Sequence, residues 1–129
     1  MIEPRWLSVD EVLHLHALQI SEFGGTPGLR DINLLEAAVM RPRQRFHYGE
    51  LKSIVELAVA YAIALSTNHP FIDGNKRVAF HSLLVFLRFH GLILDALANE
   101  AAHMMIGLAA GTVAESQLVE WVRAHVRRS

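Results

Sequence analysis

The sequence predicts an all-α fold, a compact bundle of about six helices around one central buried helix. Residues 57–65 and 78–87 are apolar nearly all round, which is typical of helices buried on every side. Capping-box spacing occurs at residues 8–11 and again at 112–115, and such boxes open helices. Strand-like alternation is nearly absent. Because 52% of the 129 residues are apolar, the chain can bury a core, and we expect a single domain over residues 1–129.

Local signals place the helix boundaries in order along the chain. Residues 1–7 form a short lead-in, and Trp6 is expected to pack on the core. Residues 24–30 hold three glycines and a proline, so they predict a loop. Asp31 is expected to cap a short helix that Pro42 ends, because proline lacks the N–H that a helix interior needs. The expected helices are residues 8 to about 23, 31 to about 40, 51 to 68, 75 to 90, a fifth that is capped by Asp95 or Asn99 and stops at Gly111, and 112 to about 126. An irregular connection is expected at 43–50 and a brief extended piece at 92–94.

Composition excludes several classes of protein. The net charge of −1 gives no basic field that would attract nucleic acid. The absence of cysteine excludes a disulfide framework and thiolate metal sites. No apolar run reaches the ~18 residues that span a bilayer, and no basic-then-apolar leader opens the chain. A soluble, cytoplasmic protein is therefore expected.

A polar loop lies between the two most apolar helices, at residues 69–77, and its charges indicate an anion site. Pro70 ends the preceding helix, and Gly74 permits a backbone conformation closed to other residues. Asn75 is expected to cap the next helix. Lys76 and Arg77 then lie in the first turn, where the helix is already partially positive, and a bound phosphate would resolve this conflict.

Two further residues of this loop suggest chemistry at that phosphate. Asp73 beside the anion site suits Mg²⁺ held on a polyphosphate, although an Asp-Gly pair can equally be a turn or cap. His69 has an unperturbed pKa suited to a general base near neutral pH, although it could be a plain helix-end histidine. Phe71 is expected to anchor the loop in the core.

The nine residues His-Pro-Phe-Ile-Asp-Gly-Asn-Lys-Arg, at positions 69–77, closely resemble the signature of the Fic/Doc family, in its Doc (death-on-curing) branch. Residues 24–31 look like the upstream loop of that family, and residues 86–91 look like the end of its central helix. The resemblance covers nearly the whole chain. It implies an all-helical protein that moves part of a nucleoside triphosphate onto a hydroxyl of a target protein.

Two positions favour the Doc branch. Fic proteins that transfer AMP usually carry a glycine where this chain has Lys76, and a further arginine where it has Phe80. In Doc-type members the terminal phosphate is implied to face the histidine, so the product is a phosphorylated protein. Pro70 and Gly74 are closer to the residues that Fic proteins have at these two positions of the motif. AMP transfer therefore stays open as an alternative, as does a catalytically silent binding module such as a DNA-binding regulator.

The resemblance also implies roles and partners. His69 would be the general base, Asp73 the Mg²⁺ ligand, and ATP the phosphate donor. Gly74, Asn75, Lys76 and Arg77 would bind the nucleotide phosphates. The implied target is translation elongation factor Tu, so translation would be blocked. The inhibitory motif of many Fic proteins fails in this chain at Trp121, which implies a separate antitoxin chain with a disordered inhibitory segment. Neither membrane nor direct nucleic-acid binding is expected.

The remaining histidines and arginines are weak signals. His14 and His16 are two residues apart, so on a helix they point to different faces. His81 is expected to be a packed or core-edge histidine. Two arginine clusters are expected to be solvated charges: residues 41, 43 and 45, and residues 123, 127 and 128.

Overall fold

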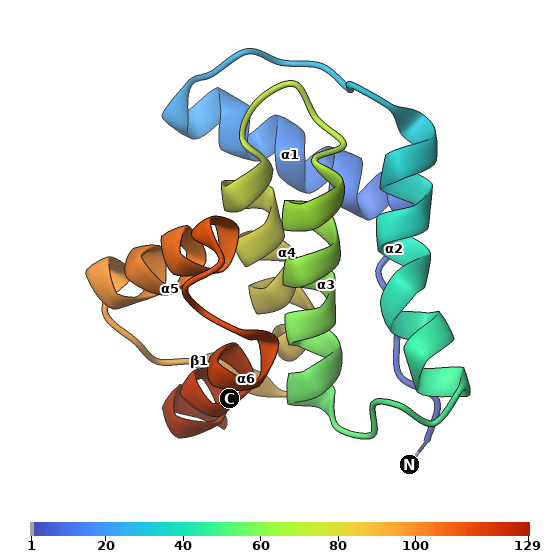
Figure 1. Ribbon diagram of the computed structural model, residues 1–129, viewed down its shortest axis with the longest axis vertical. Coiled ribbons are helices and arrows are strands. Elements are labelled where there is room, and N and C mark those ends of the chain that lie inside the picture. Colours follow the sequence, from blue (N-terminus) through green and yellow to red (C-terminus); the bar gives the residue numbers. More distant parts are fainter. Residues whose placement is uncertain (1) are drawn as a thin grey trace.

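Two helices joined by the polar loop form the centre of the molecule. The structure, a computed structural model, describes residues 2–129; residue 1, the first of the expected lead-in, lies outside them. Helix α3 (Ile54–Asn68) buries nine of its 15 residues, and α4 (Asn75–Phe89) runs back beside it (Figure 1). This pairing follows from the apolar runs, because a helix without a polar face must be covered all round.

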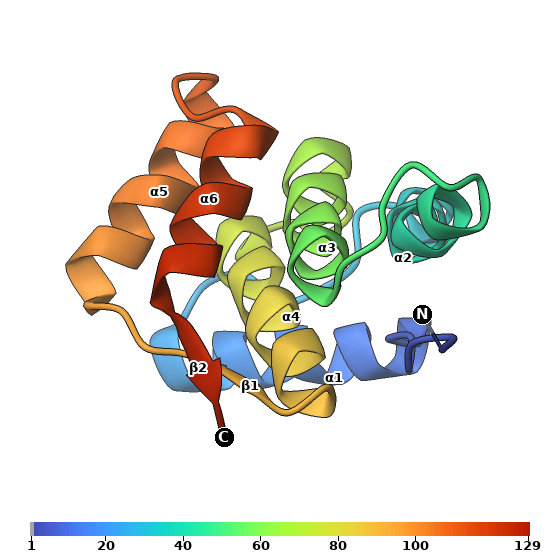
Figure 2. The same cartoon turned by 90° about the horizontal axis from the view of Figure 1, so that it is seen from below.

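Four further helices cover the central pair. Helix α1 (Val9–Phe23) packs across α4, and α2 (Ile32–His47) lies against α3 on the side away from α5 (Ala98–Ala110) and α6 (Glu115–His125) (Figure 2). Strand β1 (Leu92–Leu94) pairs antiparallel with β2 (Val126–Arg128), with Leu92 opposite Arg128. Six helices and this small sheet make up the regular structure within residues 2–129, so the predicted all-α bundle is confirmed. None of the described helices is both long and apolar enough to cross a membrane.

The predicted end of the second helix is wrong. Helix α2 continues through Pro42 to His47, over residues that were expected to form an irregular connection. A proline inside a helix costs about 3 kcal/mol through its missing hydrogen bond. The continued turn gains tertiary contacts, because Pro42 is buried and the Phe46 ring packs 5.5 Å from that of Trp6. Trp6 also stacks on Phe86 at 6.1 Å, which confirms its expected place on the core.

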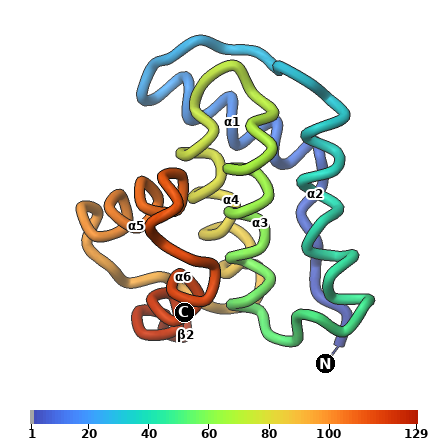
Figure 3. Tube along the Cα trace, in the orientation of Figure 1, coloured from blue at the N-terminus to red at the C-terminus, as the bar shows by residue number. Residues whose placement is uncertain are grey.

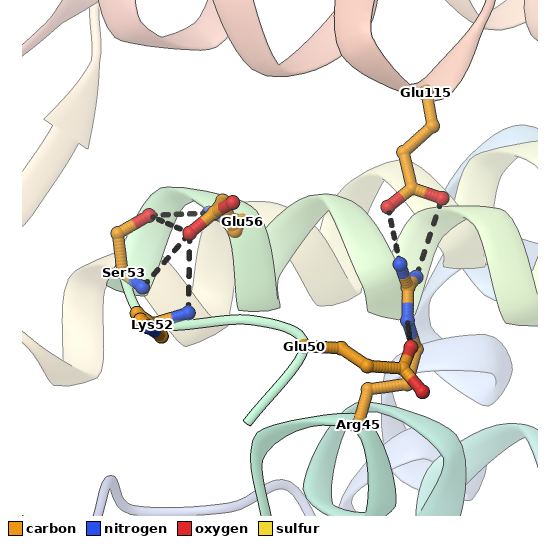
Figure 4. Close-up of polar contacts among 6 residues, drawn as sticks. All are labelled: Arg45, Glu50, Lys52, Ser53, Glu56 and Glu115. Carbon is orange, nitrogen blue, oxygen red and sulfur yellow. Dashed lines mark hydrogen bonds and ion pairs between the residues drawn. The ribbon is translucent and has the colours of Figure 1, made fainter. Parts of the chain in front are cut away.

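Arg45, expected to be a solvated charge, instead ties α2 to α6. Its guanidinium makes a two-pronged ion pair with Glu115, at 2.9 and 3.2 Å, and binds Glu50 at 3.2 Å (Figure 4). Its side chain is only 18% exposed. The same view shows the capping box of α3, in which Ser53 and Glu56 satisfy each other's backbone N–H groups. This box opens α3 at Ile54, three residues later than expected.

The caps expected from single residues also need correction. Ser8 and Glu11 do form the predicted box of α1, and Asp31 caps α2. Helices α4, α5 and α6, however, begin after Gly74, Leu97 and Ala114. The expected cap side chains are otherwise engaged: the Asp95 carboxylate accepts from Arg127 Nε at 3.3 Å, and the Thr112 hydroxyl donates to the carbonyl of Gly107. Asn99 lies inside α5, and the sixth helix ends at His125 because the next three residues form β2.

Candidate active site

His69 terminates α3 in a rare backbone conformation. Its φ of 52° and ψ of 54° are left-handed, and it is the only residue other than glycine with a positive φ among those the structure describes. This conformation costs roughly 1–2 kcal/mol and needs support from its surroundings. Arg30 supplies support: its Nε donates to the His69 carbonyl at 2.7 Å and its Nη2 to the Asn68 carbonyl at 2.9 Å. The His69 residue itself is exposed.

The loop after His69 is anchored from within by Asn75. Its Oδ1 accepts the Phe71 N–H at 3.0 Å and its Nδ2 donates to the Phe71 carbonyl at 2.9 Å. Asn75 is thus buried and closes the loop, and the residue in the N-cap position is Gly74, at φ 77°. No described side chain caps α4, so the first N–H groups of the helix are not satisfied by a capping side chain. Phe71 is 1% exposed, which confirms it as the anchor.

The glycine-rich segment 24–31 lies along the motif loop, although they are some 40 residues apart in the chain (Figure 3). The Ile72 N–H donates to the Gly28 carbonyl at 3.1 Å, and the Arg30 N–H donates to the Pro70 carbonyl at 2.7 Å. Leu29 and Phe71 form an isolated antiparallel bridge between these contacts. The two loops therefore form one hydrogen-bonded unit at the same end of the bundle.

Asp73 sits at the tip of this unit and is held by backbone N–H groups. Its Oδ2 accepts from Thr26 at 3.0 Å and its Oδ1 from Gly74 at 2.8 Å. The Thr26 N–H, then that of Gly74, keeps the pKa of the carboxyl below its ordinary value, and Arg77 adds to this effect. An ionised carboxylate is what a cation site requires.

The surroundings of Asp73 fit a magnesium ion on a polyphosphate. Each carboxylate oxygen keeps a lone pair beyond its N–H contact. A side chain at Gly25 would place its Cβ 2.7 Å from Oδ2, so glycine keeps this face of the carboxylate open. Within residues 2–129 no three His, Cys, Asp or Glu side chains are grouped as a metal site. A Mg²⁺ ion here would depend on Asp73, phosphate oxygens and water, the kind of set that Mg²⁺ prefers on nucleotides.

The cations complete the site from the start of α4. Arg77 donates from Nη2 to the Gly24 carbonyl at 3.1 Å, and its guanidinium lies 6.0 Å from the ring of Phe23. Lys76 is exposed beside it. All six sequence-predicted site residues line one cavity of about 330 Å³; the lining residues are Ser66, His69, Ile72, Asp73, Gly74, Asn75, Lys76, Arg77 and Ala109.

Three residues of this region were missed by the sequence reasoning. Arg30 holds the His69 backbone from the neighbouring loop. Ser66 lines the cavity, and its buried Oγ finds no hydrogen-bond partner among residues 2–129. His16, dismissed as a weak signal, lies buried beneath the motif loop. Its one available signal was its spacing from Ile20, which puts both on the same helical face.

Comparisons with known proteins show which family the chain resembles. The model of the Fic/DOC family matches residues 6–87. The chain is 35% identical over 120 residues to "Protein kinase doc" of Escherichia phage P1, covering 92% of this chain and 94% of that protein. It is 41% identical over 76 residues to "Toxin Doc" of Mycolicibacterium smegmatis, covering 57% of this chain and 58% of that one.

Proposed function

The chain belongs to the Fic/Doc family, and on this premise we propose that it is a Doc-like toxin that transfers the γ-phosphate of ATP to a serine or threonine hydroxyl of a target protein. The observation that carries the proposal is the single cavity onto which His69, Asp73 and the two cations of α4 converge. The name of the phage P1 relative, a protein kinase, supports the same reaction class.

The start of α4 would bind the phosphates of ATP. Its first-turn N–H groups have no side-chain cap, and its dipole favours an anion. Arg77 and Lys76 add positive charge at the same end. Asn75 would contribute through its backbone and its second amide hydrogen, since its other side-chain contacts close the loop. Asp73 would hold Mg²⁺, which screens the phosphate charge when bound.

His69 would act as the general base. Its exposed ring lines the cavity, where it would take the proton of the target hydroxyl as that oxygen attacks the γ-phosphorus. The new P–O bond forms as the bond to the bridging β–γ oxygen breaks, and ADP leaves. Catalysis of this kind depends on positioning and charge stabilisation. The Arg30 contact would contribute by holding the His69 backbone.

Phe80 supports transfer of the terminal phosphate over transfer of AMP. It lies one helical turn beyond Lys76 and lines a second cavity of about 330 Å³. Apart from Lys76, Arg77 and His81, that cavity is lined by apolar side chains. Burial lowers the pKa of His81, which keeps its imidazole neutral near neutral pH. No third cation therefore stands where AMP-transferring relatives have their second arginine.

The same apolar cavity supports an antitoxin partner. It is lined by α4 and α5, and it includes Met105 and the exposed Ile106. We propose that a disordered segment of a separate antitoxin chain folds onto this surface, next to the phosphate cations, and so blocks the nucleotide. If Ile106→Asp no longer binds the antitoxin segment but still transfers phosphate, this location is supported. Unchanged binding would place the antitoxin elsewhere.

The transfer reaction can be tested on a purified target. Elongation factor Tu, the cytoplasmic target we propose, is incubated with the protein, ATP and Mg²⁺, and its intact mass is measured. We expect a gain of one phosphoryl group that is lost in His69→Ala. A gain of one adenylyl group would instead establish AMP transfer. If neither appears, a cell lysate with γ- and α-labelled ATP separates a wrong target from an inactive binding module.

A further inference from the structure

His16 lies on α1 directly below the motif loop. It is 4% exposed, and its helical neighbour Ile20 is one turn further along the same face. An added Cβ on Gly74 would lie 3.5 Å from His16 Nε2 and 3.3 Å from Ile20 Cδ1. The motif loop therefore packs directly against this face of α1.

Two contacts join His16 to the loop. Its ring stacks on that of Phe71, with centroids 3.7 Å apart and planes within 7°. Its Nε2 lies 2.7 Å from the backbone carbonyl oxygen of Asp73. A carbonyl oxygen only accepts, so Nε2 must carry the hydrogen and donate it. The ring thus binds two residues of the loop that are separated only by Ile72.

The bond to Asp73 is separate from the other supports of the loop. Asn75 holds the Phe71 backbone, and the N–H groups of Thr26 and Gly74 hold the Asp73 carboxylate. His16 alone, among the side chains described, binds the Asp73 carbonyl. If His16 only filled the core, its ring nitrogen could form a hydrogen bond with any nearby backbone group. It instead binds the backbone of Asp73, whose carboxylate is the proposed metal ligand.

We propose that His16 is a positioning residue that fixes the Asp73 backbone, and with it the direction of the carboxylate toward the metal and phosphates. The inference rests on the proposed function, in which Asp73 holds the metal. It requires a hydrogen-bond donor at the Nε2 position, whereas simple core packing requires only a side chain of the right size. That difference can be tested by substitution.

Three variants separate the donor from the packing. His16→Phe keeps an aromatic ring for Phe71 but has no donor, whereas His16→Gln places an amide N–H near the Nε2 position. His14→Phe makes the same change at an exposed site on the same helix. With Mn²⁺ as the metal probe and a non-hydrolysable ATP analogue, we expect His16→Phe to weaken metal binding roughly three- to tenfold, the loss of one hydrogen bond. His16→Gln and His14→Phe should stay within about twofold.

Hydrogen exchange gives a readout that needs neither metal nor activity. Because the Gly74 and Thr26 amides bind the Asp73 carboxylate, they should exchange faster in His16→Phe than in His16→Gln. If these amides exchange equally fast in His16→Phe and His16→Gln, or if both variants lose Mn²⁺ binding equally, the proposal is overturned and His16 only packs against the loop. Should His16→Phe fail to fold, His16→Met provides a donor-free chain of similar length. If the wild type binds no Mn²⁺, the proposed function fails, while exchange still decides the role of His16.

Discussion

Replacing Gly25 by alanine is expected to damage the site far more than the same change at Gly24. Gly25 has φ +118°, and its added Cβ would lie 2.7 Å from Asp73 Oδ2 and 3.2 Å from Arg77 Nη2. Gly24 has φ +80°, and its added Cβ would meet nothing within 4 Å. The two neighbouring glycines thus share a positive φ and differ in the space around them.

The expected loss of stability has two parts, the backbone strain of alanine at a positive φ and the close contacts of the added Cβ. A positive φ costs alanine about 1–3 kcal/mol, and both variants carry that cost. Only at Gly25 must the surroundings also move, which disturbs the hydrogen bond from the Thr26 N–H to Asp73 Oδ2 and costs about a further 1 kcal/mol. The atoms that must move belong to Asp73, Arg77 and Ile20, whose Cδ1 would lie 3.1 Å away, so the carboxylate or the loop shifts. Misplacement of about 1 Å in a catalytic group can lower a rate roughly hundredfold.

Urea unfolding and phosphate transfer should be measured on the same preparations. We expect Gly24→Ala to be less stable than wild type by about 1–3 kcal/mol. Transfer by the folded protein should fall less than in Gly25→Ala, because the Gly24 backbone carbonyl can still accept from Arg77. Gly25→Ala should be less stable by about 1 kcal/mol more and should lose at least tenfold in transfer. Equal losses in the two variants would refute the reasoning, because backbone strain would then account for both.

Three further substitutions test other contacts of the fold and site. The backbone N–H groups of Thr26 and Gly74 hold the pKa of Asp73 in the folded protein below the ordinary pKa that it has in the unfolded chain. The carboxylate therefore stabilises the fold fully at a pH above the unfolded pKa, and this stabilisation is lost as the pH falls through the folded pKa. Urea midpoints should therefore fall more steeply on acidification in wild type than in Asp73→Asn, and parallel curves would contradict this. Arg30→Met removes both side-chain bonds that support His69 and should lower the turnover number roughly tenfold in steady-state kinetics, with Arg30→Lys retaining more of it. Arg45→Met leaves Glu115 unpaired and should lower the free energy of unfolding by about 1–2 kcal/mol in urea, with turnover of the folded protein unchanged. A large loss of turnover there would show that α2 and α6 influence the cavity.

The boundaries that sequence reasoning placed correctly depend on neighbours within one turn. Ser8 with Glu11 opens α1 because both partners of that box lie three residues apart. The apolar run before His69 is a buried helix because its residues leave no polar face. Pro42 misled the same reasoning, because the contacts that carry α2 past it come from elsewhere in the chain. Arg45 binds Glu115, which is 70 residues away in the chain, and local sequence patterns cannot predict a contact at such a separation.

For this protein the sequence by itself determined the helical fold and the family. It also predicted the six candidate site residues, because they lie close together in the chain and their chemistry is readable from residue type. Only the tertiary structure decided what supports them. Asp73 and His16 are 57 residues apart, and His69 and Arg30 are 39 apart, yet each pair is joined by a 2.7 Å hydrogen bond. Such bonds depend on how the two loops and α1 pack, because burial against a particular neighbour, rather than helical spacing, brings donor and acceptor together.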